Sequence, residues 1–182
     1  MSPNARRQRG FTLIELLMTV ALAATLMAIG LPVLLDVNEN TKLNGAGREL
    51  ERELQSARLR AVTNNRPLRV RLNCPAVGYY RTVEVLGTVA DDSVDRCRQT
   101  VYPFPADTDI MTRPNYDGPT RVLPNQATVT TEVIEFRPDG TAYTVAANVA
   151  QPIATTTTLT LTRNGKSKVV SINGAGKIQL QH

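Results

Sequence analysis

Few residues of this sequence have side chains that could carry out catalysis or hold a metal. Among 182 residues there is a single His, His182 at the last position, with two Cys and no Trp. A triad that contains His, a metal site of several His, and a zinc module with two pairs of Cys all need more of these residues. Nor do a nucleophile, a base and an orienting residue come together along the chain. We therefore expect no enzyme activity, no cofactor and no metal site.

The most unusual charge is Glu15, which lies inside an apolar stretch. This stretch runs from Phe11 to Leu35, 25 residues with no other charge, and about 20 apolar residues cross a bilayer as a helix. An ionised carboxylate in lipid costs a few kcal/mol and marks a candidate functional group. A cut between Gly10 and Phe11 would create a cationic amine four residues from Glu15. That amine could neutralise Glu15 within one helix or between neighbouring subunits.

The charges around the apolar stretch predict its orientation in a membrane. Arg6, Arg7 and Arg9 precede it, and Asp36 is the first acid after it. The positive-inside rule places residues 1–10 in the cytoplasm and the chain from Asp36 onward outside. A cleavable secretory signal fits poorly, because its apolar core is shorter and ends at a small-residue cleavage site. A simple signal anchor is the alternative from hydropathy alone.

Residues 9–16, RGFTLIEL, resemble a class III (type IV prepilin) signal. The match comprises the basic leader, the Gly before the cut, the Phe after it and a Glu at the fifth mature position. The resemblance implies cleavage after Gly10 by prepilin peptidase, N-methylation of Phe11 and assembly into a pilus or pseudopilus. In such a filament, Glu15 would act in assembly, paired with the N-terminal ammonium of a neighbour.

Gly30 and Pro32 fit the same resemblance. In pilins, a region of Gly and Pro in the first helix marks where the helix bends or melts in the filament. Pro32 removes one helical hydrogen bond and clashes with the preceding turn, and Gly30 lowers helix propensity. We expect a helix bend here, which is compatible with an ordinary kink in a membrane helix.

After Pro32 the apolar pattern becomes one face of an amphipathic helix. The apolar residues at this spacing are Leu43, Ala46, Leu50, Leu54, Ala57 and Ala61. Asn64-Asn65-Arg66-Pro67 predicts the end of the helix. We expect one long helix from about Thr12 to Thr63, with a transmembrane or filament-core part over 11–35 and an amphipathic continuation over 36–66.

The remaining chain has the alternation and turn residues of β-strands. The predicted strands are Leu68–Leu72, Tyr79–Leu86, Val133–Phe136, Thr141–Val145, Thr158–Thr162, Lys168–Ile172 and Lys177–Leu180, with turns at Pro138–Gly140, Asn164–Gly165 and Asn173–Gly176. Residues 87–126 are rich in Pro, Asp and Thr, and we expect an irregular insertion. A helix followed only by strands predicts an α+β fold, in which an antiparallel sheet packs on the apolar stripe of the helix.

Two further segments resemble the GspH/FimT family of minor pilins and pseudopilins. They are residues 55–67 at the end of the long helix, and the motifs at 134–140, 159–162 and 173–178. The resemblance implies a leader at 1–10, a filament-core helix, and a periplasmic β-rich domain at 67–182. It implies a structural subunit that helps initiate or cap a type II secretion pseudopilus or a type IV pilus at the inner membrane. The implied partners are other pilins of the filament, prepilin peptidase and the inner-membrane assembly platform.

Cys74 and Cys97 would then lie in the oxidising periplasm, where disulfides persist. A disulfide would close a loop of about 24 residues, add on the order of 3 kcal/mol of stability, and tie the insertion to the first strand. The alternative is two free, partly buried thiols.

Five acids gather in the insertion, and we expect a solvated acidic loop. They are Asp91, Asp92, Asp95, Asp107 and Asp109. A calcium loop needs closely alternating oxygen ligands with a Gly turn, and this spacing does not match.

Arginines near the end of the helix and on the first strand form the main basic cluster: Arg58, Arg60, Arg66, Arg69 and Arg71. Alternation predicts Arg69 and Arg71 on the polar face of the strand, where they would bind phosphate or face solvent. FimT-type pilins implicated in DNA uptake carry Gly-Arg-x-Arg near the C-terminus. The matching place here is Gly176-Lys177-Ile178-Gln179, which lacks the second base, and Lys has no bidentate fork. A DNA-binding minor pilin, with contacts at Arg69, Arg71 and Lys177, is therefore the secondary hypothesis.

Overall fold

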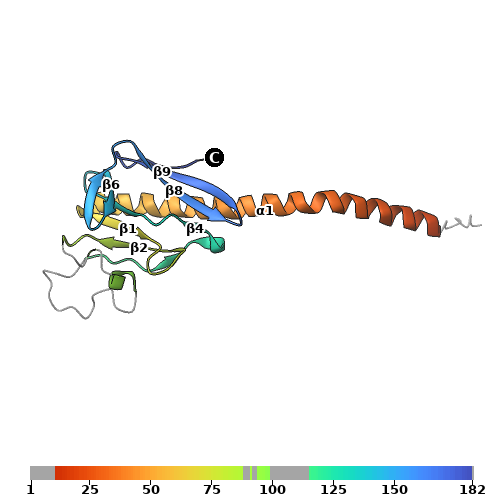
Figure 1. The fold of residues 1–182 in the computed structure, drawn as a ribbon, viewed down its shortest axis with the longest axis horizontal. Coiled ribbons are helices and arrows are strands. Elements are labelled where there is room, and N and C mark those ends of the chain that lie inside the picture. The colour runs from red at the N-terminus through yellow and green to blue at the C-terminus, as the bar shows by residue number, and fades with distance from the viewer. Residues whose placement is uncertain (1–10, 88–90, 92–93, 99–114, 182) are drawn as a thin grey trace, which may run out of the picture. The chain divides into compact units, whose positions relative to one another are not determined.

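The structure is a computed structural model that describes residues 11–87, 91, 94–98 and 115–181 (Figure 1). The chain divides into two compact units, Met1–Asn38 and Glu39–His182. We call the second unit the head. One helix, α1 (Leu13–Asn64, 52 residues), begins in the first unit and ends in the head. The predicted helix and the predicted α+β class are both confirmed.

The ends of α1 follow local rules. Thr12 precedes the helix, and its Oγ1 accepts a hydrogen bond from the Glu15 N–H at 3.4 Å. The Glu15 carboxylate accepts one in return from the Thr12 N–H at 3.5 Å, which makes a capping box. At the other end, Asn65 has a positive φ of 52° and Pro67 follows, so the helix cannot continue.

Helix α1 continues without a break through Gly30 and Pro32. The helix bend expected there concerns the helix in the assembled filament, so it stays a prediction. The part of α1 in the first unit has a mean hydropathy of 2.2 over 18 residues, and none of that window is buried. Within the described residues, α1 is the helix long and apolar enough to cross a membrane.

The head contains two antiparallel sheets where a single sheet was expected. The six-stranded sheet has the order β3 (Arg121–Val122), β2 (Tyr79–Glu84), β1 (Leu68–Leu72), β5 (Val133–Phe136), β6 (Ala142–Ala146) and β7 (Val149–Pro152). The four-stranded sheet has the order β10 (Ile178–Gln181), β9 (Lys166–Asn173), β8 (Thr156–Arg163) and β4 (Thr128–Val129). The chain leaves the first sheet after Pro152, which has no N–H to extend a ladder.

One core joins the helix to both sheets. The six predicted residues of the helix stripe, from Leu43 to Ala61, are at most 2% exposed. They pack with Val70 and Phe136 of the six-stranded sheet and with Leu159 and Val170 of the four-stranded sheet. The predicted apolar face of the helix is therefore confirmed.

The end of the expected irregular insertion, residues 115–126, is ordered against β2. Asp117 forms a bridge with Val83, and Arg121–Val122 forms β3 beside Tyr79 and Tyr80. A short 3-10 turn, η2 (Val94–Cys97), comes before β3 in the chain, and another, η3 (Pro124–Gln126), follows it. The expected insertion thus includes one two-residue strand at its end, which is too short to show as a pattern in the sequence.

Candidate functional site

The described part of the first unit exposes a long apolar surface that no other described part of the chain covers. Every Leu, Ile, Met, Val and Phe between Phe11 and Val37 is at least 56% exposed. A continuous apolar surface of this extent marks a contact with a membrane or with another protein. This part of α1 is therefore the candidate assembly site.

Glu15 lies at the start of that surface. Its carboxylate accepts hydrogen bonds from the N–H and the hydroxyl of Thr12, at 3.5 and 3.4 Å. The sequence predicted only an N-terminal amine, from the same helix or from a neighbouring subunit, as the partner of Glu15. The contact with Thr12 was missed, although a Thr three residues before a Glu is the capping-box spacing. Gly10 lies outside the described residues, so cleavage after Gly10, methylation of Phe11 and pairing of Glu15 with a neighbour stay predictions.

Arg69 is buried inside the head, whereas the sequence predicted that it would bind phosphate or face solvent. Only 3% of Arg69 is exposed. Its Nε donates to the Glu135 carboxylate at 2.9 Å, and its Nη1 donates to Asn148. Arg69 and Glu135 are register partners on β1 and β5. Alternation assigned the correct face of the strand, but in the fold that face is covered.

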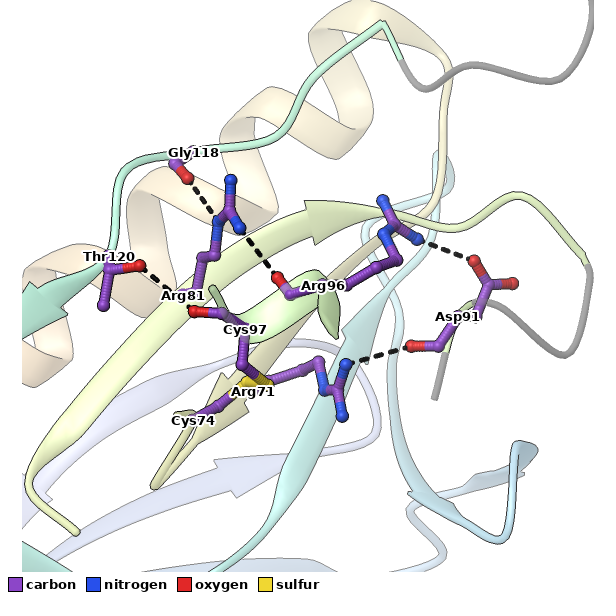
Figure 2. The surroundings of a disulfide bond; sticks show 8 residues. All are labelled: Arg71, Cys74, Arg81, Asp91, Arg96, Cys97, Gly118 and Thr120. Carbon is purple, nitrogen blue, oxygen red and sulfur yellow. Dashed lines mark hydrogen bonds and ion pairs between the residues drawn. A yellow bond between two sulfur atoms is a disulfide. The ribbon is translucent and has the colours of Figure 1, made fainter. Parts of the chain in front are cut away.

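The same outer face of the six-stranded sheet carries a buried network of charges (Figure 2). Arg96, fully buried in η2, donates to Asp91 at 2.8 Å and to Asp117 at 2.7 Å. Arg81 on β2, 1% exposed, donates to the carbonyls of Gly118 at 2.6 Å and Arg96 at 2.8 Å. Each buried guanidinium thus faces an acceptor, as burial of a charge requires.

A disulfide between Cys74 and Cys97 lies beside this network (Figure 2). Cys74 follows β1, and Cys97 ends η2 directly after Arg96. The Thr120 hydroxyl donates to the Cys97 carbonyl at 3.3 Å, and Arg71, half-buried, donates to the Asp91 carbonyl at 3.4 Å. These bonds hold η2 and the segment before β3 against the sheet.

Burial changes the proton equilibria in the network. It raises the pKa of Asp117, although Arg96 and Arg81 favour the charged form. Among the described residues, the Asp117 Oδ2 has no hydrogen-bond partner, which agrees with this direction. Burial also lowers the pKa of Arg81, against the opposite effect of Asp117.

Asp91 corrects the expectation of a solvated acidic loop. It is 1% exposed, and its carboxylate also accepts the N–H groups of Leu86 and Gly87, at 2.8 and 2.7 Å. Asp92, Asp107, Asp109 and the side chain of Asp95 lie outside the described residues. Within the described parts of the chain, no group of three or more His, Cys, Asp or Glu could hold a metal ion.

Lys177 lies at a groove between the end of α1 and two turns of the head. The groove has a volume of about 510 Å³ and includes Arg58, Leu59 and Asp139 in its lining. Arg58 donates to the carbonyls of Gly140 at 2.9 Å and Ala175 at 3.2 Å. Lys177 is exposed, so it is the one member of the predicted DNA contacts with an open side chain.

Comparison with known families agrees with these features. A model of the prokaryotic N-terminal methylation motif matches residues 5–31. The model of the type II transport protein GspH matches residues 46–176, more than half of the chain. The chain belongs to the GspH family. The predicted resemblance is therefore confirmed, and the GspH family is a pilin-like, structural one. A comparison with curated protein sequences gives no match.

Two solved structures of the type IV minor pilin FimU of Pseudomonas aeruginosa (strain PAO1) are similar to this GspH-family chain. In one crystal form, the identity is 22%, the match covers 80% of this chain and 92% of the FimU chain, and the TM-score is 0.50. In the other, the identity is 22%, the coverage 77% and 93%, and the TM-score 0.46. At this identity, the first match establishes a shared pilin fold.

Proposed function

We propose that the chain is a minor pseudopilin or minor pilin, a structural subunit that helps initiate or cap a type II secretion pseudopilus or a type IV pilus. The observation that carries this proposal is the apolar surface of residues 11–37, most of which lies within the match to the N-terminal methylation motif at residues 5–31. A helix with this surface needs lipid or other apolar helices around it. In a pilus subunit, it would have lipid before assembly and neighbouring helices afterwards.

Processing and location follow from the motif. Prepilin peptidase would remove residues 1–10 after Gly10, and Phe11 would be methylated. The subunit would sit in the bacterial inner membrane through residues 11–35, with its N-terminus in the cytoplasm and residues 67–182 in the periplasm. Its partners would be other pilins of the filament and the inner-membrane assembly platform.

Glu15 would set the register between subunits. In the membrane-resident monomer, its carboxylate lies near the cytoplasmic interface, where Thr12 can satisfy it. In a bundle of helices, an unpaired carboxylate would be costly, whereas the N-terminal ammonium of a neighbour would compensate it. Subunits would then dock only when their helix ends lie at the right relative height. The alternative is that Glu15 serves only recognition by the peptidase or the membrane machinery.

The test is to co-express the chain with prepilin peptidase and partner pilins. Intact mass should show loss of residues 1–10 from the wild type and no such loss from Gly10→Ala. Glu15→Val should be cleaved and inserted normally but should co-purify or crosslink with partners several-fold less. Thr19→Val is the matched control, because the Thr19 hydroxyl donates only to the Leu16 carbonyl of its own helix. Wild-type recovery of cleaved Glu15→Val would contradict the register role.

The alternative function, DNA binding at a pilus tip, has weaker support. Arg69 is buried and paired, and Arg71 is half-buried, which leaves Lys177 exposed at the groove. DNA binding through phosphates weakens steeply with salt. Micromolar binding at physiological salt, lost in Lys177→Ala, would support this alternative over a purely structural role.

A further inference from the structure

Loops of the head form hydrogen bonds and ion pairs with one turn of α1, which starts at Glu39. The Glu39 Oε2 accepts hydrogen bonds from Arg163 and from the Asn164 amide, the latter at 2.9 Å. Its Oε1 lies 3.5 Å from the Lys42 ammonium one turn further on. Arg163 and Asn164 belong to the tip of the β8–β9 hairpin, about 124 residues away along the chain.

A second loop of the head meets the same helix turn. The Asn125 amide, in η3, donates to the Lys42 carbonyl at 3.2 Å. Arg163 also donates through Nε to the Asn125 carbonyl, so the two loops are bonded to each other as well as to the helix. Arg163 is largely buried, with 13% of its side chain exposed. We call Glu39, Lys42, Asn125, Arg163 and Asn164 the helix clamp.

The charges of the helix clamp favour the ionised form of the Glu39 carboxylate. Burial alone would raise the pKa of Glu39, but the hydrogen bond from Asn164 and the charges of Arg163 and Lys42 outweigh it, so the pKa lies below its ordinary value. A guanidinium bonded to a carboxylate is a stronger link than a neutral hydrogen bond. The carboxylate of Glu39 is therefore the centre of the helix clamp.

Helix α1 is packed against the head after the helix clamp, but its apolar side chains are exposed before it. Leu43, one residue after Lys42, is the first residue of the buried stripe and is 1% exposed. On the other side, the large apolar side chains up to Val37 are exposed, and Gly30 and Pro32 weaken the helix locally. Without tertiary packing, a helix is marginal in water, and segments with few buried contacts open at low free energy.

We propose that the helix clamp stops the unwinding of α1: opening that starts in the N-terminal half ends at Glu39 and does not enter the head. The helix could then bend, stretch or leave the bilayer before residue 39 while the stripe from Leu43 onward stays packed. The proposal concerns the chain alone and does not depend on the filament in which the chain would act.

Hydrogen exchange of the full chain in detergent micelles tests this proposal. In the wild type, amides from about residue 40 onward should exchange slowly. Glu39→Gln keeps the shape but removes the charge, and Arg163→Met removes the bonds to both Glu39 and Asn125. Both variants should raise exchange at residues 40–46 about tenfold or more, with residues 50–64 unchanged. Glu49→Gln is the matched control, because it removes an exposed pair with Arg52 on the same helix.

Limited trypsin digestion gives an independent readout. There is no Lys or Arg between Phe11 and Thr41, so cleavage after Lys42 separates the N-terminal part of α1 from the head. The wild type and Glu49→Gln should resist this cleavage, while Glu39→Gln and Arg163→Met should be cut about tenfold faster. If Arg163→Met loses protection throughout the strands, it has unfolded the head, and Glu39→Gln alone decides. Unchanged exchange and cleavage in Glu39→Gln would overturn the proposal.

Discussion

The two halves of α1 belong to one continuous helix but are stabilised in different ways. In the half from Glu39 to Asn64, a stripe of apolar residues is buried against two sheets of the same chain. In the half from Leu13 to Asn38, the large apolar residues are exposed. Burial of apolar surface stabilises by roughly 25 cal/mol per Å². In the head this burial stabilises the fold, whereas in the first half the large apolar side chains are not buried against any described part of the chain.

The carboxylates of the head and Glu15 of the first half also differ in their partners. In the head, the buried carboxylates of Asp91, Asp117 and Glu135 all lie beside arginines of the same chain. Glu15, within the described residues, accepts hydrogen bonds from Thr12 in the first turn of its own helix. We expect the carboxylates paired within the head to contribute to the stability of the fold, and Glu15 to act in assembly. Substitutions in the two regions should therefore affect different measurements.

The largest expected effect comes from the helix stripe. Leu54 is fully buried and Leu22 is 64% exposed. We expect Leu54→Ala to lower the free energy of unfolding of the head by about 4 kcal/mol, because it loses buried surface and leaves a cavity. Leu22→Ala should change it by less than about 0.5 kcal/mol. Urea unfolding of the full chain in detergent, followed by circular dichroism of the strands, measures both. Equal losses would mean that the first half also stabilises the head.

The next effect concerns the buried charges. Arg96→Met leaves Asp91 and Asp117 without their shared cation, and we expect a loss of about 3 kcal/mol in the free energy of unfolding. Arg52→Met is the control: Arg52 pairs with Glu49, its side chain is 71% exposed, and such pairs contribute below about 1 kcal/mol. The same urea experiment compares them. A loss for Arg96→Met as small as that of the control would show that the network does not stabilise the head.

A smaller effect should depend on pH. Asp139 accepts hydrogen bonds from the hydroxyl and the N–H of Thr141, which hold the pKa of Asp139 below its ordinary value of 3.8. The folded state thus binds fewer protons than the unfolded state, so this stabilisation is present above pH 3.8 and is lost as pH falls through the folded pKa. Thr141→Val should be slightly less stable than wild type at neutral pH, and the difference should shrink in acid. Thermal unfolding between about pH 6 and pH 3 measures it; a difference that grows in acid would contradict the sign.

The smallest expected effect is that of Glu15→Val on the head itself. Because the contacts of Glu15 lie within its own helix turn, the free energy of unfolding of the head should change by less than about 0.5 kcal/mol. The same variant should weaken assembly with partner pilins. A clear loss of head stability would mean that the two halves of α1 are coupled more strongly than their burial suggests.

Local patterns were sufficient for much of the fold. The spacing from Leu43 to Ala61 predicted the buried face of α1, and β5 has the predicted bounds, Val133–Phe136. The Asn164–Gly165 hairpin also forms, with positive φ at both residues. In each case, the signal lies within a few residues of the chain, so periodicity or turn chemistry alone predicts the element. Strands β3 and β4 were missed because two residues are too few to show alternation, and β7 was missed because Val149–Pro152 does not alternate and ends in Pro.

The sequence by itself determined the apolar N-terminal helix, the motif around Gly10 and Glu15, and the amphipathic stripe that meets the sheets. Only the tertiary structure decided which polar groups are buried. Alternation assigns Arg69 to a face of β1, but its burial there depends on Glu135 of β5 and on Asn148 in the β6–β7 turn, which are distant in sequence. Likewise, Glu39 meets Arg163, and Arg96 meets Asp117, only because the fold brings distant segments of the chain together. Periodicity records which side of an element is apolar, whereas the partner of a charge depends on contacts between distant segments.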